Sequence, residues 1–212
     1  MATIARNPAI AVLLGAAAVA WVVTYERMHG MDAGPGTELG GLGWYLGIWV
    51  TMTAAMMLPT TVRVARAVSF AVGYLAVWTV FGLAAYLVFR NGISTEVAGV
   101  LLVAAGVYQL TPLKQRSLGR CRTAHDGGEL RGGVMHGLDC VGSSGGLMVA
   151  LFALGVMSLW WMAAIAVAIF TEKVLPQGPR LTGVFAVALV VLGIGVAMSP
   201  ENVPGLTEME EM

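Results

Sequence analysis

Charged residues are scarce in this chain. They make up 11% of its 212 residues, whereas apolar residues make up 58% and the mean hydropathy is +0.79. Soluble domains usually carry about 25% charged residues, so this chain has too few to cover the surface of a soluble domain. The scarcity excludes a soluble enzyme, a nucleic-acid-binding protein and a disordered chain. We therefore expect an integral membrane protein surrounded by a lipid bilayer.

Residues that carry chemistry are also few. Two cysteines exclude a disulfide framework. There are three histidines. His29 is expected on the outer side of the membrane, His125 in the cytoplasm and His136 within the membrane. This distribution argues against a bis-histidine haem and excludes a multi-histidine oxidase centre. The chain also has no glycine-rich phosphate loop and no nucleophile elbow. We expect no enzyme activity, no haem and no bound nucleotide.

The chain contains several long apolar runs between its charged segments. A membrane-spanning helix needs about 20 apolar residues, and seven runs qualify, none with the alternation of a membrane β-barrel strand. The sequence predicts an all-α, polytopic membrane protein with about seven transmembrane helices in a single domain. The expected spans are 8–25, 42–62, 67–89, 97–113, 133–157, 159–174 and 181–199. We interpret the first as a retained helix, and the sixth depends on a turn at Ser158.

The placement of the basic residues predicts the orientation. With the N-terminus in the cytoplasm, ten of the twelve lie in inner segments and only Arg27 and Arg90 lie in outer ones, as the positive-inside rule requires. This places a basic loop at 114–132 in the cytoplasm and an acidic tail at 200–212 outside. The expected location is the inner (plasma) membrane, as a multi-pass protein.

The second run contains two methionines on one helical face, because Met52 and Met56 are four residues apart. Thioether sulfur is a soft ligand suited to Cu(I). The alternative interpretation is that both side chains fill gaps in a helical core.

The fifth run holds three ionisable residues within one helical turn. His136 and Cys140 are four residues apart and share a face, and Asp139 lies close to it. Ionisable residues at membrane depth are costly and often functional, and histidine and cysteine at this spacing suit a transition metal. The alternative is an Asp139–His136 pair that fixes packing, with Cys140 as a small apolar filler.

The same run carries two small-xxx-small pairs, a spacing that lets helix backbones approach closely. We expect this helix to lie centrally, against several neighbours. The glycines concerned are Gly133, Gly137, Gly142 and Gly146.

Three further residues are candidates with weaker arguments. Cys121 lies between two arginines, which favour a reactive thiol, although an inert free thiol is the alternative. Lys114 is expected to extend its amine to the inner interface. Glu172 and the adjacent Lys173 end the sixth run and are expected to form an interfacial ion pair worth little.

Four signatures occur together in order. They are AMM-x-P at 55–59, YxxTPLK at 108–114, HGxxCxG at 136–142 and EK at 172–173. Over 44–195 the chain resembles an uncharacterised bacterial family of predicted metal-binding integral membrane proteins. The resemblance implies a multi-helix membrane protein with a metal site built on cysteines.

The chain departs from that family pattern at three positions where the family has cysteine. Ser117, Ser143 and Ser144 stand there instead, and serine is a poor ligand for soft metals. The resemblance thus implies one of two outcomes. Either the site is reduced to His136, Cys140 and methionines, or the protein keeps the scaffold without the metal.

Three functions follow from these observations. The first is metal handling at a copper site made by His136, Cys140, Met52, Met56 and Asp139, with a metallochaperone or another membrane protein as partner and no nucleic acid. The second is a non-catalytic accessory or structural subunit of a larger membrane complex that has lost metal binding. A small transporter or channel ranks third, because we find no repeat of broken helices.

Overall fold

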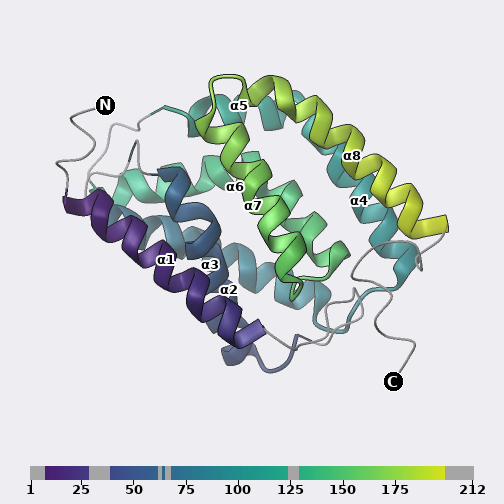
Figure 1. The fold of residues 1–212 in the computed structure, drawn as a ribbon, viewed down its shortest axis with the longest axis horizontal. Helices are drawn as coiled ribbons and strands as arrows, with labels where there is room; N and C mark the ends of the chain where they lie inside the picture. The colour runs from purple at the N-terminus through teal and green to yellow at the C-terminus, as the bar shows by residue number, and fades with distance from the viewer. Residues whose placement is uncertain (1–7, 29–38, 62–63, 65–67, 124–128, 199–212) are drawn as a thin grey trace.

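The computed structural model describes residues 8–28, 39–61, 64, 68–123 and 129–198. Over these residues the fold is all-α with no strand, which confirms the predicted class (Figure 1). The eight helices are α1 (Pro8–Met28), α2 (Leu42–Thr61), α3 (Val68–Phe89), α4 (Thr95–Gln109), α5 (Pro112–Cys121), α6 (Glu129–Leu154), α7 (Leu159–Val174) and α8 (Gly178–Met198).

Five helices are long and apolar enough to cross a membrane, namely α1, α2, α3, α6 and α8, and the bent pair α4–α5 would make a sixth. The shorter α7 coincides with the expected range 159–174. Seven spans and their orientation stay predictions. His29, His125 and the acidic tail at 200–212 lie outside the described residues.

The largest difference from the expected elements is a break in the range 97–113. Helix α4 ends at Gln109, and α5 begins at Pro112 after a bend of 66°. Proline lacks an N–H donor and favours the first position of a helix, and Thr111 before it adopts an extended backbone. Thr111 accepts a hydrogen bond from the Lys114 N–H at 3.3 Å and so caps α5. The start of the expected basic loop at 114–132 is therefore helical.

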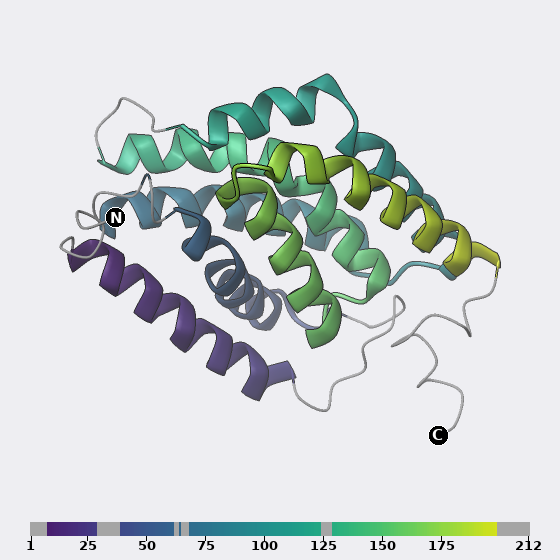
Figure 2. The same cartoon turned by 45° about the horizontal axis from the view of Figure 1, so that its top comes forward.

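Helix α6 is the centre of the bundle. It packs against α3, α4, α5 and α7, and 72% of its most apolar stretch of 18 residues is buried, against 22% for the corresponding stretch of α1. Figure 2 shows α5 turned back over α6, while α4 and α8 lie side by side on the other flank.

Glycines on α6 set these contacts. A Cβ on Gly133 would collide with the carbonyl of Phe70 on α3, and a Cβ on Gly137 would lie 3.0 Å from Val77. Gly142 and Gly146 face other neighbours, because a Cβ there would lie 2.6 Å from Ser117 Oγ on α5 and 2.8 Å from Tyr108 on α4. The Phe70 backbone leaves no room for a Cβ at Gly133, and at the other three positions a side chain of the neighbouring helix would have to shift, so the four glycines fit α6 closely against three helices.

The connection between α6 and α7 is a tight turn. Gly155 has a φ of 98°, a left-handed conformation that glycine adopts without strain. The Ser158 N–H donates to the Gly155 carbonyl at 3.0 Å, and Ser158 is the N-cap residue of α7. The turn returns the chain along α6 and carries the end of α7 back to the region where α6 begins.

Candidate metal centre

His136 and Cys140 lie one turn apart on α6 and are both buried, with exposed fractions of 2% and 0%. The rings of Phe70 and Tyr74 on α3 lie 5.6 and 5.8 Å from the His136 ring, centroid to centroid. These aromatic rings close one side of the imidazole. The predicted pair therefore faces α3 inside the bundle.

A second cysteine joins the pair from a different helix. Cys121 is the last residue of α5 and is 5% exposed. Its Sγ lies 3.7 Å from His136 Nε2, one helical turn from Cys140 on α6. The bend before α5 is what brings this residue onto α6. We call Cys121, His136 and Cys140 the sulfur cluster.

Two polar side chains contact the Cys140 sulfur. Lys173 Nζ on α7 donates a hydrogen bond to Cys140 Sγ at 2.6 Å. The Tyr74 hydroxyl lies 2.8 Å from the same sulfur. Both side chains are buried. The sulfur cluster is thus enclosed by residues of α3, α5, α6 and α7.

The predicted Glu172–Lys173 ion pair is replaced by two separate interactions. Lys114 Nζ lies 2.7 Å from Glu172 Oε2, with both side chains fully buried, while Lys173 turns to Cys140. The expectation that Lys114 extends to the interface is therefore wrong, because the buried carboxylate of Glu172 draws its amine inward. The Arg122 guanidinium donates to the Glu172 and Leu175 carbonyls at 2.6 and 2.9 Å. These contacts fasten α5 to the end of α7.

Asp139 is occupied by a different partner. Its Oδ1 lies 2.8 Å from Arg120 Nε, and this pair sits at the edge of the bundle, where Arg120 is 62% exposed. The pair adds a link between α5 and α6. The role of Asp139 as a metal ligand stays a prediction.

Met52 and Met56 are buried on α2, at 0% and 2% exposure. This helix packs chiefly on α1, α3 and α7. Met56 lines an apolar pocket between α1, α2 and α7, together with Trp21, Pro59 and Phe170. The two methionines as ligands also stay a prediction.

The donor set of the sulfur cluster has a clear chemical character. Two thiols and an imidazole are soft or borderline donors, which suit Cu(I) and zinc better than magnesium or calcium. Within the described part of the chain, no group of three or more His, Cys, Asp and Glu side chains is arranged to hold a metal ion. A closed structural zinc site uses four such ligands, so the cluster does not fit that kind of site.

Sequence reasoning missed how Tyr74 and Lys173 contribute, and it left Cys121 apart from the predicted ligands. The sequence did give an indication for Lys173, because a lysine at the end of an apolar run needs a polar partner if its side chain points into the bundle. Cys121 had an indication in the resemblance, which implies a metal site built on cysteines. Tyr74 had none, since its contact depends on how α3 packs on α6.

A scan against protein families matches residues 46–196 to a family described as a copper chaperone, PpoB2. No curated protein and no solved structure matches the chain. The expected relation to a metal-related family is confirmed, and copper is the metal that the family description names. Because the match covers most of the sequence, the chain belongs to the PpoB2 copper chaperone family.

Proposed function

We propose that this protein is a membrane-embedded copper chaperone that holds Cu(I) at the sulfur cluster and passes it to a partner protein. The observation that carries the proposal is the contact of Cys121 with His136, one turn from Cys140, since Cys121 is ten residues beyond the Thr111 bend and reaches α6 only because of it. Copper is the cargo here rather than a resident cofactor.

The residues present fit Cu(I). Thiolate and imidazole are ligands that Cu(I) prefers, and a low-coordinate ion needs no third or fourth protein ligand. The sulfur cluster is almost closed to solvent, with Cys121 as its most exposed member at 5%. Burial protects Cu(I) from oxidation in water, and the position of Cys121 at the end of α5 suggests the side on which copper enters and leaves.

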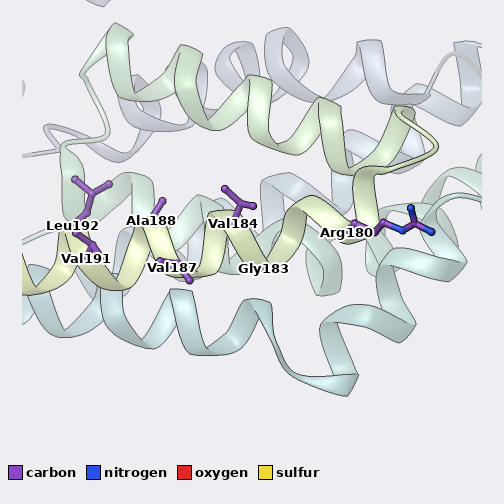
Figure 3. Close-up of a pocket in the computed structure, with 7 residues that line it drawn as sticks. All are labelled: Arg180, Gly183, Val184, Val187, Ala188, Val191 and Leu192. Atoms are coloured by element: carbon purple, nitrogen blue, oxygen red, sulfur yellow. The ribbon is translucent and has the colours of Figure 1, made fainter.

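The surface supports placement in a membrane. Large apolar side chains are exposed along α1, α3 and α8, including Val19, Val80, Leu87 and Val187, each more than 60% exposed. Exposed apolar area of this extent marks contact with lipid or another protein. A shallow apolar groove follows α8, with Arg180 at one end of the row (Figure 3). Arginine at the end of an apolar helix commonly reaches the headgroup region.

The test is copper binding by the purified protein in mild detergent under reducing conditions. After Cu(I) loading and removal of excess metal, elemental mass spectrometry should give close to one copper per chain. Cys121→Ser and Cys140→Ser should each abolish retention, and His136→Ala should weaken it. Ser144→Ala, a buried change on the same helix, is the matched control and should retain copper.

The same measurement decides the roles of the other predicted ligands. Met52→Leu, Met56→Leu and Asp139→Asn should leave the copper content unchanged if the sulfur cluster alone holds the ion. A loss in any of them would add that residue to the site. Copper-free wild-type protein would overturn the proposal and favour the accessory subunit that has lost metal binding.

A further inference from the structure

Among the described residues next to the sulfur cluster, most of the charged side chains have a partner of opposite charge or a backbone partner. Lys114 is paired with Glu172, and Arg120 with Asp139. Arg122 donates to two backbone carbonyls at the end of α7, the negative end of the helix dipole. In the described part of the four helices around the cluster, Lys173 is the cation whose side chain contacts the Cys140 sulfur, at 2.6 Å.

We propose that Lys173 selects for a monovalent cargo by fixing one positive charge beside the Cys140 sulfur. This inference rests on the function proposed above and names the specificity of the same site. Metal binding requires both thiols to lose their protons. Two thiolates, the Lys173 ammonium and one monovalent ion then sum to zero charge.

A divalent ion in the same place leaves one positive charge uncompensated. An unpaired charge in a buried site is costly, and here the whole cluster is buried. The ammonium 2.6 Å from Cys140 Sγ therefore stabilises the Cu(I) complex and opposes the Zn(II) complex, although both metals accept sulfur ligands. Softness alone would not separate Cu(I) from divalent ions that also favour thiolates.

The test separates charge from softness with two closed-shell probe ions. Ag(I) and Cd(II) both bind thiolates, and they differ by one unit of charge. The affinities of the protein for Ag(I), Cd(II) and Cu(I) are measured by chelator competition. The samples are detergent-purified full-length wild type, Lys173→Met and Lys173→Arg. Cd(II)–thiolate absorbance provides an independent readout of divalent binding.

We expect Lys173→Met to lower the ratio of Ag(I) affinity to Cd(II) affinity at least tenfold. The affinity for Cu(I) should change in the same direction as that for Ag(I). Lys173→Arg, which keeps the charge, should hold the ratio within about threefold of wild type. If Lys173→Met fails to fold, Lys173→Gln takes its place and the same shift is expected.

Two results overturn the inference in distinguishable ways. If the neutral variant weakens Ag(I) and Cd(II) equally, or leaves both unchanged, Lys173 does not select by charge, and the copper function stands. If wild-type protein binds neither Cu(I) nor Ag(I), the proposed function falls and the inference with it.

Discussion

Lys114 and Glu172 form a salt bridge 2.7 Å long with neither side chain exposed. The two residues come from α5 and α7, and the bridge holds the helix that carries Cys121 against the helix that carries Lys173. A buried pair of this kind contributes less net stability than its short distance suggests, because both charges lose their water. Its effect is instead to fix which helices meet.

Removing one member of the Lys114–Glu172 pair should be far more damaging than removing both. Lys114→Met leaves a buried carboxylate without its partner and should cost about 3–5 kcal/mol of stability. The double variant Lys114→Met, Glu172→Met should recover much of that loss. The measurement is unfolding in detergent, followed by circular dichroism, with the exposed Arg116→Met as control. Equal losses in the single and double variants would contradict this account of the pair.

Close packing of α3 on α6 predicts a sharp size limit at Gly133. A Cβ at this position collides with the Phe70 carbonyl, so Gly133→Ala should destabilise the protein by about 1–3 kcal/mol. Gly183→Ala on α8 is the matched control, since nothing lies within 4 Å of its Cβ position. The control should be neutral or stabilising, as alanine favours helix over glycine. Thermal melts in detergent compare the two.

The cap of α5 should control access to Cys121. Thr111→Ala removes the hydrogen bond to the Lys114 N–H and should cost about 1 kcal/mol of helix stability. In a Cys140→Ser background, maleimide should then modify Cys121 several-fold faster, because α5 leaves α6 more often. Ser94→Ala removes the corresponding cap of α4 and serves as the control. Identical labelling rates in the two cap variants would argue against this role for Thr111.

The number of spans can be read from reporter fusions. With seven spans and a cytoplasmic N-terminus, alkaline phosphatase fused after Gly92 or Met198 should be active, and after Thr123 inactive. The Met198 fusion tests α7, because a chain in which this short helix does not cross places Met198 in the cytoplasm. A fluorescent protein that folds only in the cytoplasm, fused at the same positions, should give the opposite pattern.

The fold class was predictable because long apolar runs permit few structures in a membrane. The central position expected for the helix with Gly133 and Gly146 also follows from small-residue spacing, and in the structure α6 packs against α3, α4, α5 and α7. The break before Pro112 was only partly visible. Proline indicated a boundary, but nothing local showed that the chain would bend by 66° and continue as α5.

The sulfur cluster was predictable only where its residues share one helix. His136 and Cys140 follow from a spacing of four, whereas Cys121, Tyr74 and Lys173 arrive from three other helices. The outward expectation for Lys114 failed for the same reason. A lysine near the end of an apolar run reaches water unless a carboxylate is buried nearby, and Glu172 is distant in sequence.

The order in which the chain is made bears on the sulfur cluster. Both cysteines and His136 are present once α6 has been synthesised, whereas the ammonium of Lys173 arrives only with the last turn of α7. A nascent chain that ends after α6 therefore carries two thiols without their counter-cation. Because the Gly155 turn must form before Lys173 can return along α6, the sulfur cluster gains its lysine contact only after this hairpin has closed.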